Sequence, residues 1–133
     1  MKRTKLSDRQ LPDYSRGEEI MNMVTHIVGG AVGVVALTLC VIFAALHGNP
    51  WGVVTSAIYG SAMVTMFTIS SVYHGLKPTL GKKVMQMIDH CTIYFLIAGT
   101  YTVILLSAIR PENPVLAWVL FGFEWGMVAL ATT

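Results

Sequence analysis

Four long apolar segments dominate this 133-residue sequence and restrict what it can fold into. Each segment is long enough for a helix that crosses a hydrocarbon core of about 30 Å. Lipid offers no partner for a free backbone N–H or C=O group, so each segment requires a helical backbone. We therefore predict an all-α membrane protein with four transmembrane helices, over residues 20–46, 51–75, 84–109 and 114–133.

The composition agrees with a membrane protein. Hydrophobic residues make up 54% of the chain and charged residues 12%, which is about half the charged share of a soluble domain. The first apolar segment is too long for the apolar region of a signal peptide, and no small-residue cleavage motif follows it. Cys40 and Cys91 lie within apolar segments, so we interpret them as small hydrophobic residues rather than as a disulfide pair.

The basic residues predict the orientation, because loops rich in lysine and arginine stay in the cytoplasm. Residues 1–17 are predicted to form a cytoplasmic polar tail, and residues 18–133 the transmembrane domain. The loop between the second and third helices is also predicted to be cytoplasmic, whereas the two opposite loops contain one basic residue, Arg110. The basic residues on the predicted cytoplasmic side are Lys2, Arg3, Lys5, Arg9, Arg16, Lys77, Lys82 and Lys83.

Polar side chains gather near the cytoplasmic ends of the predicted helices. Ser70 and His74 are four residues apart and share one face of the second helix. Asp89 and His90 lie near the start of the third helix, and Tyr94 lies about one turn deeper. Ionisable groups within a membrane are costly and usually functional, so we interpret these residues as one candidate site. The first helix adds Glu19, Asn22, Thr25 and His26, whose spacings of three and four place them on one face.

These residues also have structural interpretations. His26, taken by itself, suits the headgroup level of a membrane. Ser70 could bond back to a carbonyl one turn earlier, and Asp89 could be a helix N-cap or first-turn residue. His47 is interpreted as a solvated turn residue, and Glu124, in the fourth segment, has no partner that the sequence identifies.

A histidine, a carboxylate and a serine at one membrane depth suit hydrolytic chemistry. Catalytic zinc uses three protein ligands and one water, and a carboxylate can hold that water and act as a base. A serine hydroxyl can bond a substrate carbonyl or an oxyanion. His74 is the histidine directed at such a site, with His26 and His90 as further candidates, so spacing does not supply a full set of ligands.

Small residues on two helices predict close packing. Gly29 and Gly33 share one face of the first helix, and Ser56 and Gly60 share a face of the second. Small side chains let transmembrane helices approach closely, and we assign these positions no catalytic role.

Three longer motifs follow one another along the chain. They are Glu19-x-x-Asn22-x-x-Thr25-His26, Ser70-Ser71-Val72-Tyr73-His74 and Asp89-His90-Cys91-Thr92-Ile93-Tyr94, the last continuing through Leu96-Ile97-Ala98-Gly99-Thr100-Tyr101-Thr102. In order and separation they resemble the hemolysin III family, within the wider adiponectin/progestin receptor (PAQR) superfamily. The resemblance extends from about Glu18 to the end of the chain and implies the N-terminal four helices of a seven-helix bundle. The fourth segment also lacks a polar anchor after it, so we expect the chain to be truncated.

The resemblance implies a zinc site near the cytoplasmic face. His74 would be a direct ligand, Asp89 would hold the metal-bound water, and Ser70 would lie beside it. The other two histidines of the family site come from an H-x-x-x-H pair on the last helix, which this chain does not contain. We therefore expect the chain by itself to be inactive. Val103 stands where the family usually has proline, which is expected to remove a kink from the third helix.

Three functions stay open from the sequence. The first is a zinc-dependent membrane hydrolase that acts on a lipid amide or ester. The second is a pore-forming or cytolytic protein, although the helices lack the continuous polar stripe of an aqueous pore. The third is a metal-stabilised, receptor-like lipid sensor. The expected partners are membrane lipids, one of them a candidate substrate, and no nucleic acid. The expected location is the bacterial inner membrane, in several passes, with the oligomeric state left open.

Overall fold

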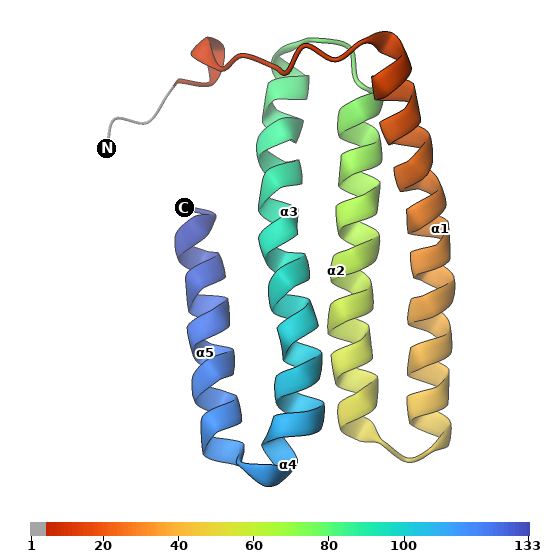
Figure 1. Cartoon of the computed structure of the whole chain (residues 1–133), viewed down its shortest axis with the longest axis vertical. Coiled ribbons are helices and arrows are strands. Elements are labelled where there is room, and N and C mark those ends of the chain that lie inside the picture. Colours follow the sequence, from red (N-terminus) through yellow and green to blue (C-terminus); the bar gives the residue numbers. More distant parts are fainter. Residues whose placement is uncertain (1–4) are drawn as a thin grey trace.

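The computed structural model describes residues 5–133, which form helices and no strand (Figure 1). Within residues 5–15, a short 3-10 turn is the only helical element before the first long helix begins. In chain order the elements are η1 (Leu6–Asp8), α1 (Arg16–Leu46), α2 (Pro50–Gly75), α3 (Leu80–Ile104), the π-helical turn η2 (Leu105–Ile109), α4 (Arg110–Glu112) and α5 (Pro114–Ala131).

Four helices of the described residues are long and apolar enough to cross a membrane. They are α1, α2, α5 and the continuous helix formed by α3, η2 and α4 over Leu80–Glu112. The protein is therefore a multi-pass membrane protein, and the predicted all-α class with four transmembrane helices is confirmed.

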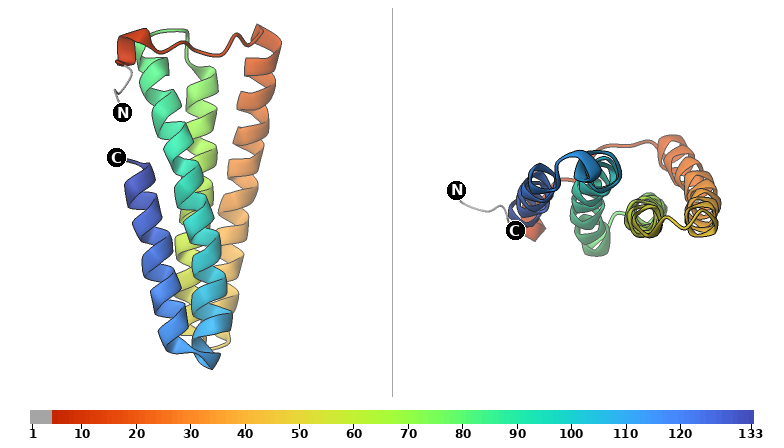
Figure 2. Two further views of the ribbon diagram at one scale, coloured as in Figure 1. Left: turned by 60° about the vertical axis from the view of Figure 1, so that its left-hand side comes forward. Right: turned by 90° about the horizontal axis from the view of Figure 1, so that it is seen from below.

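The four helices run antiparallel in a row (Figures 1 and 2). α1 packs on α2, α2 on α3, and α3 on α5, so each long helix touches its neighbours in the chain. Among the described residues the backbone of α1 does not pack against that of α3 or α5, although the side chains of Glu19 and Lys82 meet at one end, and the row is open rather than closed into a bundle. We call the end of the row where α1 begins, α2 ends and α3 begins the basic end.

Two helices begin earlier than the apolar pattern predicts. α1 begins at Arg16 rather than at residue 20, because Ser15 and Glu18 form a reciprocal capping box in which each side chain bonds the other residue's backbone N–H. α3 begins at Leu80 rather than at residue 84. Hydropathy identifies the lipid-embedded part of a helix, whereas capping residues mark where the helix begins. A polar first turn is therefore not detected from the apolar pattern.

The predicted close packing of small residues is confirmed between α1 and α2. A Cβ atom placed on Gly29 would lie 2.7 Å from the ring of Phe67, and one on Gly60 would lie 2.5 Å from Cδ1 of Leu37. Gly33 is buried in the same interface. These contacts hold the two helices at a separation that larger side chains would not permit.

The third transmembrane helix is not regular throughout. The backbone passes into the π-helical turn η2 two residues after Val103, so an irregularity occurs here without a proline. Thr55 of α2 lies beside this turn, with its hydroxyl 3.3 Å from that of Ser107. The helix then continues through α4 to Glu112, beyond the predicted end at residue 109.

Candidate functional site

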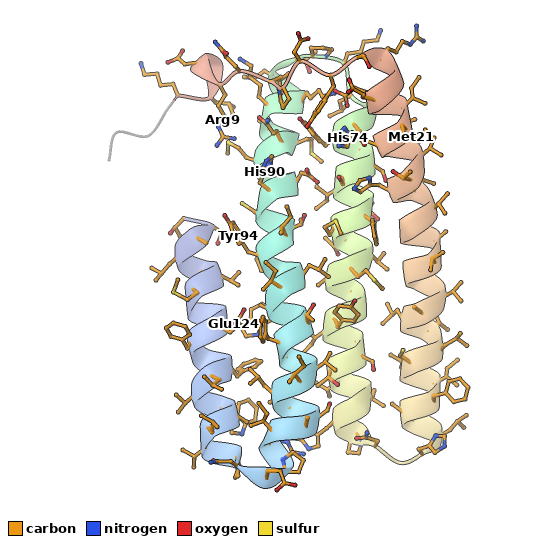
Figure 3. All side chains as sticks on the ribbon, viewed as in Figure 1. Arg9, Met21, His74, His90, Tyr94 and Glu124 are labelled. Atoms are coloured by element: carbon orange, nitrogen blue, oxygen red, sulfur yellow. The ribbon has the colours of Figure 1, made fainter. Side chains whose placement is uncertain are left out.

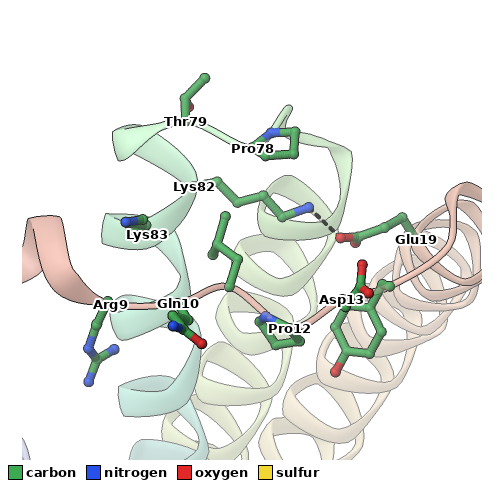
Figure 4. A pocket seen from close by; sticks show the side chains of 11 residues that line it. Arg9, Gln10, Pro12, Asp13, Glu19, Pro78, Thr79, Lys82 and Lys83 are labelled. Carbon is green, nitrogen blue, oxygen red and sulfur yellow. Dashed lines mark hydrogen bonds and ion pairs between the residues drawn. The ribbon is translucent and has the colours of Figure 1, made fainter.

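Three charged or ionisable side chains from three helices meet at the basic end. Glu19 of α1 lies between His74 of α2 and Lys82 of α3. Figure 4 shows the ion pair between Glu19 and Lys82. One carboxylate oxygen, Oε2, is 2.7 Å from His74 Nδ1, and the other, Oε1, is 2.5 Å from Lys82 Nζ. We call these three residues the charge triad. His74 and Lys82 are 55 and 63 residues from Glu19 in the sequence, so the charge triad forms only because the three helices pack together.

Lys82 is buried, with 3% of its surface exposed. Its ammonium group donates to Glu19 and to the backbone carbonyl of Leu76, 3.1 Å away, and lies 5.1 Å from the centre of the Tyr73 ring. A buried cation is costly unless it is paired and hydrogen-bonded, and this lysine is both. The sequence pattern assigned Lys82 to a loop and did not include it in the candidate site. The reason is that the predicted start of the third helix, residue 84, lies after Lys82.

A signal for Lys82 was present in the spacing. Lys82, Gln86 and Asp89 follow one another at intervals of four and three residues, which puts them on one face of a helix that begins at Leu80. Lys82 and Gln86 are both buried on that face, whereas Asp89 is half-buried. A helix start four residues earlier would have predicted Lys82 on the same helix face as Asp89, about two turns away.

The contact with Glu19 decides how the His74 ring is held. A carboxylate that is bonded to an ammonium group can only accept hydrogen bonds, so Nδ1 of His74 must carry the hydrogen and donate it. In the neutral ring the lone pair is then on Nε2. Aromatic rings surround this imidazole, with centroid distances of 4.7 Å to Tyr73 and 5.9 Å to both Tyr14 and His26.

The other predicted residues of α1 make local contacts. Nδ1 of His26 lies 2.6 Å from the Asn22 carbonyl, and the Thr25 hydroxyl donates to the Met21 and Asn22 carbonyls. His26 also stacks edge-on against Phe67, so it lies near His74 without bonding to it. The structure thus brings His26 into the neighbourhood of the charge triad and leaves Thr25 bonded within its own helix.

His90 and Tyr94 lie away from the charge triad. Both are exposed and line a cavity between α3 and α5, whereas His74 lies on the α2 side of α3 (Figure 3). Nδ1 of His90 lies 2.6 Å from the Gln86 carbonyl, one turn earlier in the same helix. Residues 89 and 90 are adjacent in the sequence, but a step of one residue turns a helix by about 100°, which separates the two side chains.

Ser70 and Asp89 lie farther from the basic end than the members of the charge triad on their helices, Ser70 one turn before His74 and Asp89 about two turns after Lys82. Ser70 is 4% exposed and lies one turn before His74 on α2; no hydrogen bond from its hydroxyl is found within residues 5–133. The bond to a carbonyl one turn earlier is made by its neighbour Ser71, to Phe67. Asp89 is well inside α3, which begins at Leu80, so the interpretation of Asp89 as an N-cap or first-turn residue is wrong.

These residues fit one ligand position of a zinc site. A histidine that binds a metal usually donates its other ring N–H to a carboxylate or carbonyl, as His74 does to Glu19. A catalytic zinc needs three protein ligands, however, and no group of three His, Cys, Asp or Glu side chains that could hold a metal occurs in the described part of the chain. The described residues therefore supply one ligand of the right type and not a complete set.

Two hollows flank the charge triad. One, of about 570 Å³, lies between the N-terminal segment and the start of α3, and Arg9, Tyr14 and Lys83 are among its lining residues (Figure 4). The other, of about 670 Å³, has His74 in its wall together with Met23. The second hollow gives His74 contact with space outside the helices.

Glu124 lies apart from this site. It is half-buried on α5 and lines a cavity of about 160 Å³ together with Tyr94 of α3 (Figure 3). Its neighbour Trp125 donates from the indole N–H to the Thr102 hydroxyl, 3.1 Å away, which ties α5 to α3.

Comparison with known proteins decides the family. A family model described as haemolysin-III related matches residues 14–133, which is most of the chain. The chain belongs to the hemolysin III family. This confirms the resemblance that the three sequence motifs indicated. The match includes the whole of the charge triad together with Ser70 and Asp89.

Two bacterial relatives show how much of a hemolysin III protein this chain represents. The hemolysin-3 homolog of Bacillus subtilis (strain 168) is 36% identical over 110 residues, which cover 83% of this chain and 50% of that protein. Hemolysin-3 of Bacillus cereus is 36% identical over 108 residues, covering 81% of this chain and 48% of that protein. This hemolysin III chain thus spans about half the length of these relatives, and no solved structure matches it.

Proposed function

We propose that the charge triad is this chain's share of a zinc-dependent hydrolase site for a lipid amide or ester. The observation that carries the proposal is the 2.7 Å contact between Nδ1 of His74 and the Glu19 carboxylate. It fixes the hydrogen of the ring on Nδ1 and leaves Nε2 for a metal, which is the usual arrangement of a histidine ligand with its supporting carboxylate.

The residues beside His74 suit the same chemistry. When bound, zinc would lower the pKa of a water molecule and polarise a carbonyl group. Asp89 is half-buried on the adjacent helix and is the residue proposed to hold that water. Ser70 is buried one turn from His74, and its hydroxyl is available to donate to a substrate carbonyl.

A lipid substrate agrees with the lining of the hollow beside His74. Its apolar residues include Ile20, Met23 and Leu76, and it is bordered by the basic residues Arg16 and Lys77. An apolar wall next to basic groups suits an acyl chain joined to a polar head. We propose that such a lipid enters from the membrane at this point.

The remaining metal ligands are proposed to belong to the other half of the whole protein. This chain covers about half of its relatives, and its described residues do not form a set of three ligands. We therefore expect the 133-residue chain to lack hydrolase activity unless the other half of a hemolysin III protein is supplied. The likeness to the PAQR superfamily supports the same division of the site.

We propose that the protein lies in the bacterial inner membrane with its N-terminus in the cytoplasm. The support is the distribution of basic residues in the structure. Arg110 is the one basic residue at the opposite end of the described helices, beside the ring of Trp51. The basic end carries Lys5, Arg9, Arg16, Lys77, Lys82 and Lys83.

Metal content tests the hydrolase proposal. A chimera would join residues 1–133 to the C-terminal half of the Bacillus subtilis relative, and its bound zinc would be measured by mass spectrometry after purification in nanodiscs. We expect stoichiometric zinc, its loss in His74→Ala, and its retention in His47→Ala, because His47 lies at the other end of α1. Zinc that survives His74→Ala, or a chimera that folds without zinc, would contradict the proposal.

A cytolytic function is the second candidate, because both relatives carry the name hemolysin-3. Leakage of dye from liposomes separates it from the first. Leakage caused by the chimera and unchanged in a Ser70→Ala, His74→Ala, Asp89→Ala triple variant would favour cytolysis. Hydrolysis of a fluorescent lipid amide or ester that is lost in the same variant, without leakage, would favour the enzyme. Zinc without hydrolysis would favour a lipid sensor.

A further inference from the structure

We propose that Lys82 is a positioning residue that acts through Glu19 to hold the His74 ring with its hydrogen on Nδ1. The inference deepens the proposed function and rests on it, since a fixed ring nitrogen matters most if Nε2 binds a metal. It concerns a residue that lies outside the three sequence motifs and entered the prediction only as a loop charge.

Lys82 is held more firmly than the residue it contacts. Its side chain is 4% exposed, against 18% for that of Glu19. Its ammonium group bonds Glu19 and the carbonyl of Leu76, which caps the C-terminus of α2 two residues after His74. Lys82 therefore anchors to the same helix end that carries His74, and it offers Glu19 a fixed point.

Glu19 needs such a fixed point because its side chain can reach solvent. A glutamate with 18% of its side chain exposed can exchange a protein partner for water at small cost. Lys82 occupies Oε1, which turns the other oxygen, Oε2, toward Nδ1 of His74. Two hydrogen bonds, one to each oxygen of the carboxylate, define its plane as well as its position.

The other histidines provide an internal comparison. Nδ1 of His26, His47 and His90 lies 2.6–2.8 Å from the carbonyl four residues earlier in its own helix. Those contacts are built into the helix and do not involve Lys82. Of the four histidines in the sequence, all within the described residues, His74 is the one whose Nδ1 partner is a side chain. Its tautomer is therefore the one that should depend on Lys82.

The tautomer of His74 distinguishes a positioning role of Lys82 from a purely structural ion pair between Lys82 and Glu19. A structural ion pair between α1 and α3 would change the stability of the protein without moving a hydrogen on His74. A positioning role changes the ratio of the Nδ1–H and Nε2–H forms of His74 in a protein that is still folded. A charge-assisted bond of ordinary strength favours the donating form about tenfold or more.

The experiment uses the metal-free 133-residue chain with ¹⁵N-labelled histidine in nanodiscs, and records the tautomer of each ring by solid-state NMR. His74→Ala assigns the His74 signals. We expect the Nδ1–H form of His74 to dominate in the wild type. The ratio of the Nδ1–H form to the Nε2–H form should fall about tenfold in Lys82→Met and return to the wild-type ratio in Lys82→Arg. Lys83→Met is the matched control and should leave the ratio unchanged.

An unchanged His74 tautomer in folded Lys82→Met would overturn the proposal, as would an equal change in Lys83→Met. Circular dichroism checks that each variant is helical. If Lys82→Met does not fold, Lys82→Gln decides, because it removes the charge and keeps an N–H donor on a shorter side chain. It should give an intermediate ratio, and a wild-type ratio would refute the inference.

The two proposals fail separately. Zinc that survives His74→Ala in the chimera would refute the metal site, and the tautomer would still report whether Lys82 positions the ring. Zinc lost in His74→Ala together with a His74 tautomer indifferent to Lys82 would refute the positioning role and leave the metal site standing.

Discussion

Removing one member of the Glu19–Lys82 pair should destabilise the protein by an amount that depends on which member is removed. The two side chains differ in exposure, with 4% for Lys82 and 18% for Glu19. Glu19→Gln leaves a buried ammonium group without its anion. Lys82→Met leaves a carboxylate that is partly exposed and can turn toward water. The substitution at Glu19 should therefore cost more.

General magnitudes turn this asymmetry into numbers. Leaving an uncompensated buried charge costs about 3–5 kcal/mol, so Glu19→Gln should fall in that range. Lys82→Met leaves a partly exposed carboxylate that water can reach, for which about 1–3 kcal/mol is expected. The double variant has neither charge, and its glutamine can still accept from His74, so it should lie within about 1 kcal/mol of the wild type. The coupling energy of the cycle is then at least about 3 kcal/mol.

Reversible unfolding in mixed detergent micelles, followed by circular dichroism, measures the four free energies of the cycle. Lys77→Met is the control for loss of an exposed lysine at the basic end and should change the free energy of unfolding by less than about 0.5 kcal/mol. Equal losses for the two single variants would refute the argument from exposure. Additive losses in the double variant would show that the two charges do not interact.

Three further predictions concern packing and orientation. Gly60→Ala should be about 1–3 kcal/mol less stable than Gly122→Ala in the same unfolding assay. The reason is that a Cβ at residue 60 meets Leu37, whereas one at residue 122 meets nothing within 4 Å. Equal stabilities of the two variants would contradict this prediction. Thr102→Val should lower the free energy of unfolding by about 0.6–2 kcal/mol and alter the fluorescence of Trp125, whose indole N–H loses its acceptor. An unchanged spectrum and stability would show that this hydrogen bond contributes nothing. A fluorescent protein fused to the N-terminus should fluoresce in bacteria, and a periplasmic reporter at the same place should be inactive; the reverse would refute the proposed orientation.

The transmembrane helices could be predicted because lipid leaves the backbone few choices. A long apolar segment must satisfy its own N–H and C=O groups, so hydropathy located four helices that the structure contains. The helix starts were predicted less well, since Ser15 caps α1 and Thr79 precedes α3 within polar sequence. That error hid Lys82, which belongs to the first turn of α3.

The sequence predicted at which end of the helices the candidate site lies, but it did not predict which side chains contact one another there. Spacing placed Ser70 and His74 on one face of α2 and Asp89 at the same end of α3, and the structure agrees. It also placed His90 at this depth, where the structure turns the side chain toward α5. Helical periodicity defines the faces of one helix, but which neighbour covers each face depends on the order of helices in the row.

The sequence by itself determined that this chain is helical, spans a membrane four times and belongs with the hemolysin III proteins. These properties follow from local patterns: apolar length, helix periodicity and short motifs. Only the tertiary structure decided that Glu19 bonds His74 and Lys82, because the partners are 55 and 63 residues away along the chain. The physical reason is that a lone buried lysine or carboxylate is costly, and only packing of three separate helices brings the charges close enough to offset that cost.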